Sequence, residues 1–232
     1  MDSKILTMFN QGKHEEAIQA AVKAIDAAPD DPKRYAMLAT MLISIKALDQ
    51  AGELLAKARQ LFPEDLELQY TAGLFAYAQA DFAAAVSWFA KVRTDQTLKN
   101  DATYMLALSY QQAGQPTKAL AFALTAHDLA PKQLDAALLA ADLLMANDVF
   151  DAAARVLKPL LATEQPQVLF TYGMALSAAG KDGSHYLNKA KALDPKGYDQ
   201  KANIVADINR FLRLQEGQDG HAGGDCHRSG QK

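Results

Sequence analysis

The chain contains few of the residues that build covalent cross-links or membrane segments. Its 232 residues include one cysteine, Cys226, so an internal disulfide framework is excluded and a reducing compartment is favoured. No stretch is long and apolar enough to span a membrane. The first residues lack the apolar region and the cleavage site of a signal peptide. We therefore expect a cytoplasmic protein without a membrane span.

Charge of one sign is also scarce. The 24 Lys and Arg residues and the 27 Asp and Glu residues leave a formal net charge of −3. A protein that binds duplex nucleic acid concentrates positive charge on one face, because its main contacts are to phosphates. We therefore do not expect nucleic acid as a partner.

Catalytic and metal-binding motifs are absent as well. The chain has no Gly-x-Ser-x-Gly sequence and no glycine-rich phosphate loop. His221, Asp225, Cys226 and His227 could in principle bind a metal, but their spacing matches no standard zinc pattern. We expect no catalytic residue, no metal and no cofactor, and we predict that the protein is not an enzyme.

The chain does contain a repeating helical unit. Residues 32–63 hold two short amphipathic segments with apolar residues at helical spacing, and Pro63 closes the unit. Small residues recur every 34 positions through the chain. One series is Ala17, Ala51, Ala85, Ala119 and Ala153, and another is Ala39, Gly73, Ala107 and Ala141.

The small residues have a physical reason. A single helical hairpin cannot bury its apolar face, so it stacks on the next hairpin, and only Ala or Gly fits where helices approach closely. The sequence therefore predicts an all-α solenoid of about six helical hairpins. A final stripe formed by Ile204, Val205, Ile208, Phe211 and Leu212 predicts a C-terminal capping helix.

These features resemble the tetratricopeptide repeat (TPR) family. The matching residues are Leu38, Ala39, Ala51, Leu55, Ala58 and Pro63 in one unit, Ala72, Gly73, Phe82, Ala85 and Phe89 in another, and Leu106, Ala107, Tyr110, Gly114, Ala119, Ala126 and Pro131 in a third. The tryptophan that the family carries early in each unit is absent. The resemblance covers about residues 1–195, and it implies a right-handed α-solenoid that binds proteins or peptides.

The period also predicts the boundaries. We expect one superhelical domain over residues 1–214 and a disordered tail over 215–232. Within the first helix, Ile5, Leu6 and Phe9 are expected to point inward. Pro159 is expected to end or kink its helix at Lys158. The repeats are predicted near 1–29, 32–63, 66–97, 100–131, 134–165 and 166–195, with the capping helix at 199–214.

In such a solenoid the first helix of each pair lines the inner face. The positions expected there are rich in Tyr, Met, Leu and Phe, and an apolar surface of this extent indicates a contact site. The Lys, Arg and Asn cluster with which some family members hold a peptide carboxylate is absent. The predicted partner-binding residues are Tyr70, Leu74, Tyr77, Tyr104, Met105, Leu108, Leu138, Asp142, Met145 and Phe170.

The sequence thus predicts a non-catalytic interaction module that binds an apolar or aromatic peptide or helix in its concave groove. Two alternatives remain open at this point. The same face could be an oligomer interface of a self-associating scaffold, which makes a homodimer a second candidate, or the chain could be a regulatory or accessory subunit of an enzyme complex.

Overall fold

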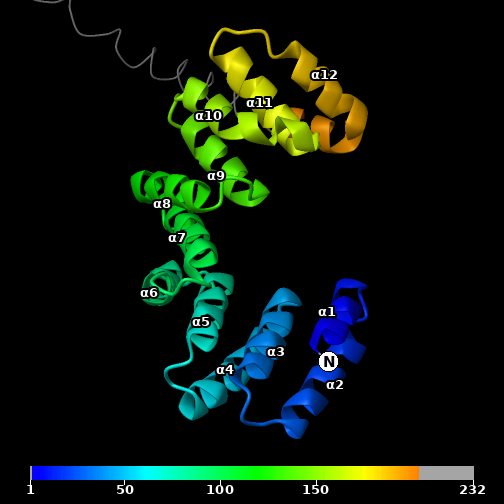
Figure 1. The fold of residues 1–232 in the computed structure, drawn as a ribbon, viewed down its shortest axis with the longest axis vertical. Coiled ribbons are helices and arrows are strands. Elements are labelled where there is room, and N and C mark those ends of the chain that lie inside the picture. The colour runs from blue at the N-terminus through cyan, green and yellow to red at the C-terminus, as the bar shows by residue number, and fades with distance from the viewer. Residues whose placement is uncertain (1, 204–232) are drawn as a thin grey trace, which may run out of the picture. The chain divides into compact units, whose positions relative to one another are not determined.

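The computed structural model describes residues 2–203, and all regular elements in that range are helices (Figure 1). The all-α fold class is therefore confirmed. Most of the predicted capping helix at 199–214, the whole predicted tail at 215–232 and Cys226 lie outside the described residues.

The helices follow one another in pairs joined by short connections. In chain order the elements are α1 (Asp2–Asn10), α2 (His14–Ala27), α3 (Pro32–Ser44), α4 (Leu48–Leu61), α5 (Leu66–Ala78), α6 (Phe82–Val92), α7 (Lys99–Gln112), α8 (Pro116–Leu129), α9 (Leu134–Met145), α10 (Phe150–Leu157), the 3₁₀ helix η1 (Lys158–Thr163), α11 (Pro166–Ala178) and α12 (Ser184–Leu193).

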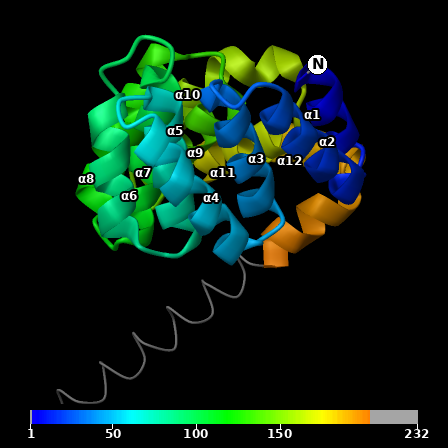
Figure 2. The same cartoon turned by 90° about the horizontal axis from the view of Figure 1, so that it is seen from below.

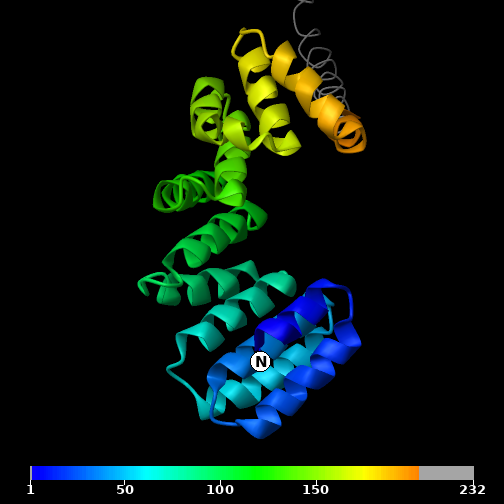
Figure 3. The same cartoon turned by 45° about the vertical axis from the view of Figure 1, so that its right-hand side comes forward.

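The contacts between residues divide the chain into two compact units, one ending at Asp148 (unit 1) and one beginning at Val149 (unit 2). In unit 1, α1 packs on α2, α3 on α4, α5 on α6, and α7 on α8, and α9 packs on α8 (Figure 1, Figure 3). The first helices α3 and α5 also lie side by side (Figure 2). In unit 2, α11 packs against both α10 and α12. The assignment of residues 1–214 to a single domain stays a prediction.

Two irregular connections follow from the local sequence. Pro159 cannot donate an amide hydrogen bond to a continuing helix, and α10 accordingly ends at Leu157 and passes into η1. The third hairpin lacks a closing proline, and Asp95 takes over the connection. Its Oδ1 accepts hydrogen bonds from the Thr97 amide at 2.9 Å and the Leu98 amide at 3.0 Å, and α7 begins directly afterwards at Lys99.

The periodic small residues are the most deeply buried part of the fold. The first series, from Ala17 to Ala153, is fully buried at all five positions. Gly73, in the second series, shows what this packing requires. A Cβ atom placed on Gly73 would lie 2.6 Å from Cε1 of Phe89, a ring with no exposed surface. The small residue here makes room for an aromatic ring of the partner helix.

The turn between the two helices of a hairpin repeats with the same period. Gly12, Lys46, Ala80, Gly114 and Asp148 are each 34 residues apart, and all have positive φ, from 59° at Asp148 to 82° at Gly12. Ala47 directly follows Lys46, and its amide donates to the carbonyl of Leu42 at 2.9 Å. This is the hydrogen bond that defines a Schellman motif at a helix C-terminus. Glycine adopts this left-handed conformation without steric cost. Lys46, Ala80 and Asp148 adopt it at a steric cost, because each carries a Cβ atom.

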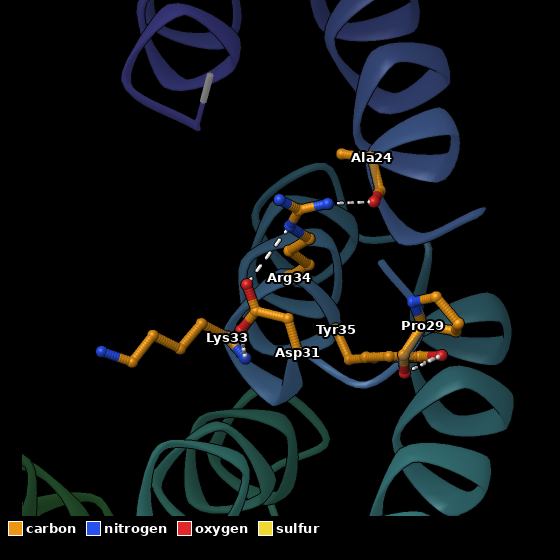
Figure 4. Close-up of polar contacts among 6 residues, drawn as sticks. All are labelled: Ala24, Pro29, Asp31, Lys33, Arg34 and Tyr35. Carbon is orange, nitrogen blue, oxygen red and sulfur yellow. Dashed lines mark hydrogen bonds and ion pairs between the residues drawn. The ribbon is translucent and has the colours of Figure 1, made fainter. Parts of the chain in front are cut away.

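The link between the first and second hairpins is held by Arg34 (Figure 4). Its guanidinium donates a hydrogen bond to the carbonyl of Ala24 in α2. Its Nε forms an ion pair with Oδ2 of Asp31 at 3.2 Å, and the Tyr35 hydroxyl donates to the carbonyl of Pro29 at 3.1 Å. A cation near the last carbonyls of α2 also interacts favourably with the helix dipole. Arg34 thus ties the start of α3 to the end of α2.

The left-handed turn position yields the first prediction. Replacing the exposed Ala80 with glycine should stabilise the protein by about 0.5–1 kcal/mol, because relief of the left-handed strain exceeds the added freedom of the unfolded chain. The measurement is the urea midpoint. Gly114→Ala should lower the urea midpoint, and so should Ala90→Gly at an exposed position inside α6. A lower midpoint for Ala80→Gly would show that φ is not strained there.

The contact between Gly73 and Phe89 yields the second prediction. Gly73→Ala should cost about 1–3 kcal/mol of unfolding free energy, because the added methyl group overlaps a buried ring. In the Phe89→Leu background the same change should cost markedly less, since the smaller side chain leaves room. Equal costs in the two backgrounds would contradict the assigned contact.

Candidate functional site

A groove opens between the first helices of unit 1. It has a volume of about 420 Å³ and is formed by α1, α3 and α5, with Leu98 at the start of α7 closing one side. We call it the first-helix groove. Its apolar lining consists of Leu6, Phe9, Ala36, Met37, Met41, Tyr70 and Leu98, and its polar lining of Asn10, Lys33, Thr40, Ser44, Glu67 and Thr71.

The hydroxyl groups in this lining are already hydrogen-bonded within their own helices. Thr40 donates to the carbonyl of Ala36, Ser44 to that of Thr40, and Thr71 to that of Glu67, each at 2.8 Å. Their donor hydrogens are therefore not available to a ligand. The groove presents mainly methyl, thioether and aromatic surface, and Lys33 and Glu67 are its charged residues.

Tyr70 connects the groove to the core. Its ring packs edge-on against Phe89, with the ring centroids 5.4 Å apart. Burial raises the pKa of the Tyr70 hydroxyl well above its usual range, and the nearby carboxylate of Asp101 raises it further. The hydroxyl is thus held in its neutral form, and the ring is fixed in position by packing.

Most of the other predicted contact residues lie on the remaining first helices of unit 1. Leu74, Tyr77 and Met105 are half-buried and pack against a core cluster that includes Phe89 and Leu106. The Tyr77 ring also contacts Phe82 edge-on, at a centroid distance of 5.6 Å. The half-buried residues further along are Tyr104, Leu108, Leu138 and Met145, and Asp142 is exposed. Each of these residues keeps part of its surface available, and their role in binding stays a prediction.

Phe170 belongs to unit 2 and has a different environment. Its side chain is 7% exposed and lies in a cluster with Leu169 and Ala190. Its ring packs edge-on against Tyr198, with a centroid distance of 5.3 Å. Phe170 thus packs within unit 2, and its role in partner binding stays a prediction.

The sequence did not identify the contribution of α1 to the groove. Leu6 was expected to point inward, and this expectation is wrong, because Leu6 is 45% exposed and lines the groove. Phe9 also lines the groove, and its ring lies tilted against that of His14 at a centroid distance of 4.5 Å.

The described residues include no group of three or more His, Cys, Asp or Glu side chains placed to hold a metal ion. Within the same range, 2–203, no helix combines the length and the apolar character that crossing a bilayer requires.

Comparisons with known proteins agree on the fold. The profile of the family described as anaphase-promoting complex, cyclosome, subunit 3 matches residues 78–160. No curated protein sequence matches the chain.

Several solved structures are similar. PilF of Pseudomonas aeruginosa is 20% identical, with a TM-score of 0.69 over 88% of this chain and 95% of that one. PilW, a widely conserved type IV pilus biogenesis factor, is 18% identical, with a TM-score of 0.70 over 84% and 92%. YrrB, a TPR protein with an unusual peptide-binding site, is 21% identical, with a TM-score of 0.60 over 81% and 99%. At these identities the similarity shows the fold alone.

The environment of Tyr70 yields the third prediction. The pKa of this hydroxyl is higher in the folded protein than the value of about 10 in an unfolded chain. The folded state therefore keeps a proton that the unfolded state loses, so the stability tied to Tyr70 is complete below about pH 10 and falls as the pH rises further. Tyr70→Phe should reduce the drop in the urea midpoint between about pH 8 and about pH 11. An equal drop in both proteins would contradict the buried position of the hydroxyl.

Proposed function

Because the chain is a tetratricopeptide repeat protein, we propose that it is a non-catalytic interaction module that binds an apolar or aromatic segment of a protein partner in the first-helix groove. The single observation that carries this proposal is the groove between α1, α3 and α5, with its apolar lining.

The groove has the properties that such binding requires. Leu6, Met37 and Tyr70 provide aliphatic, thioether and aromatic surface within one hollow. Burying apolar surface against such a lining supplies about 25 cal/mol per Å², whereas the hydroxyls of Thr40 and Thr71 have no free donor that would need a partner. Met side chains also adapt to ligands of varied shape.

The partner should be a peptide segment or helix that inserts apolar side chains. YrrB, which has a similar fold, is described as having an unusual peptide-binding site, and this supports a peptide ligand here. We further propose that the protein acts in the cytoplasm, in line with the single cysteine of the sequence. Self-association through the same face is the competing use of the groove.

The groove assignment yields the fourth prediction. Selection of short peptides from a displayed random library should enrich sequences rich in Leu, Phe, Tyr or Trp. The selected peptides should lose binding to Leu6→Glu and to Met37→Glu, because each substitution places a charge in the apolar lining. The readout is the affinity of the synthesised peptides by fluorescence polarisation.

A matched control is Leu61→Glu, which makes the same change at a residue that is 61% exposed at the end of α4, outside the groove. This variant should bind as the wild type does. Equal binding to Leu6→Glu and Leu61→Glu would overturn the assignment. A dimer in light scattering that dissociates only with Leu6→Glu would instead support the oligomer interface.

A further inference from the structure

Unit 2 contains a pocket that none of the predicted contact residues lines. Its volume is about 320 Å³, and we call it the basic pocket. It is lined by residues from α10, from the start of η1, from α11 and from the turn before α12. These residues are Asp151, Ala154, Arg155, Lys158, Tyr172, Leu176 and Lys181.

The spacing of the sequence places one wall of this pocket on a single helical stripe. Asp151 is followed after three, four and seven residues by Ala154, Arg155 and Lys158, so these side chains share one face of α10 and the start of η1. Ala153, which has no exposed surface, lies on the opposite side of the helix. Burial of that side therefore turns the stripe away from the core.

The other wall is held in place by the turn after α11. The amide of Lys181 donates to the carbonyl of Leu176 at 2.9 Å, directly after Gly180 with its positive φ of 74°. The Lys181 ammonium donates to Oδ1 of Asp151 at 2.7 Å. This pair connects the turn to α10, so that Lys181 is already positioned beside the stripe.

Tyr172 is the buried polar residue of the pocket. Its side chain is 9% exposed, and its ring packs edge-on against Tyr186 with the ring centroids 4.7 Å apart. Within residues 2–203 its hydroxyl makes no hydrogen bond, and it is not one of the fully enclosed polar atoms of that range. Burial raises the pKa of this hydroxyl, whereas the Lys181 ammonium lowers it, so the hydroxyl lies near Lys181 and keeps its proton at neutral pH. The hydroxyl is thus a rigidly held donor without an acceptor, and it belongs to the pocket that Lys181 also lines.

The pocket carries more positive than negative charge. Arg155, Lys158 and Lys181 line it together with one carboxylate, that of Asp151, which leaves an excess of two positive charges. The Lys181 ammonium lowers the pKa of the Asp151 carboxyl, and Arg155 adds to this effect, so the carboxylate stays ionised. In the described part of the chain, neither Arg155 nor Lys158 forms an ion pair. Two cations are therefore left for a ligand.

A phosphate monoester matches this set of groups. It carries a charge of about −1.5 to −2 at neutral pH, which is close to the excess in the pocket, and it has three terminal oxygens that accept hydrogen bonds. Arg155, Lys158 and Tyr172 supply three kinds of donor for these oxygens. A carboxylate has one charge and two oxygens, so it would leave a cation unmatched. Ala154 and Leu176 provide apolar contact for the carbon group that carries the phosphate.

We propose that the basic pocket binds a phosphate monoester, with Arg155, Lys158 and the Tyr172 hydroxyl donating to its terminal oxygens. The phosphate belongs either to a small molecule or to a phosphorylated side chain of a protein partner, and the experiment below separates these two sources. The basic pocket shares no residue with the first-helix groove, so this inference goes beyond the proposed function and does not depend on it.

The fifth prediction is tested by NMR titration of the full chain labelled with ¹⁵N. Phenyl phosphate should shift the amide resonances around the basic pocket, and phenyl sulfate, which has the same ring and a lower charge, should bind about tenfold more weakly. Arg155→Gln/Lys158→Gln should weaken the binding of phenyl phosphate about tenfold. Tyr172→Phe keeps the ring that packs on Tyr186 and should weaken binding about two- to tenfold, because one hydrogen bond is lost.

The matched control is Lys191→Gln/Lys196→Gln. It removes the same number of positive charges from exposed positions in unit 2 that do not line the pocket, and it should bind phenyl phosphate as the wild type does. Equal weakening in the two double variants, or unchanged affinity in Tyr172→Phe, would overturn the proposal, because diffuse surface charge would then explain the binding. Absence of saturable shifts with phenyl phosphate would overturn it as well.

Two further ligands identify the source of the phosphate. They are inorganic phosphate and the peptide Ala-Ala-Ser-Ala-Ala phosphorylated on its serine. Tighter binding of the phosphopeptide supports a phosphorylated protein partner, whereas tighter or equal binding of inorganic phosphate supports a small molecule. Leu6→Glu should leave all of these affinities unchanged, so the basic pocket and the first-helix groove are tested separately.

Discussion

Close packing of helices at small residues is the constraint on which the rest of this structure depends. Ala51, Ala85 and Ala119 have no exposed surface, and Gly73 lies directly under the ring of Phe89. Since no hairpin buries its apolar face alone, this packing both forms the core and fixes the distance to the next repeat. Tyr70 precedes Gly73 by one helical turn, so the same constraint leaves its ring half-buried and held at the edge of the groove.

The two sides of the hairpins in unit 1 therefore differ in chemistry. On the second helix α6, the half-buried ring of Trp88 is covered by Arg59 and Lys91 of the chain itself. On the first helices that form the groove, the hydroxyls of Thr40 and Thr71 are satisfied internally, and the rest of the lining is mainly apolar. The groove therefore offers a ligand apolar contact, because the donors of these hydroxyls are already used within their own helices.

The period of 34 residues predicted the helices well because it reports packing, which the small residues alone encode. It could not predict features that depend on the third dimension. Lys46 and Ala80 adopt positive φ although neither is a residue that favours it, because the turn geometry of the repeat overrides local preference. Leu6 was placed inward because α1 has no earlier hairpin to define its faces, and Phe170 is buried because Tyr198 packs onto it.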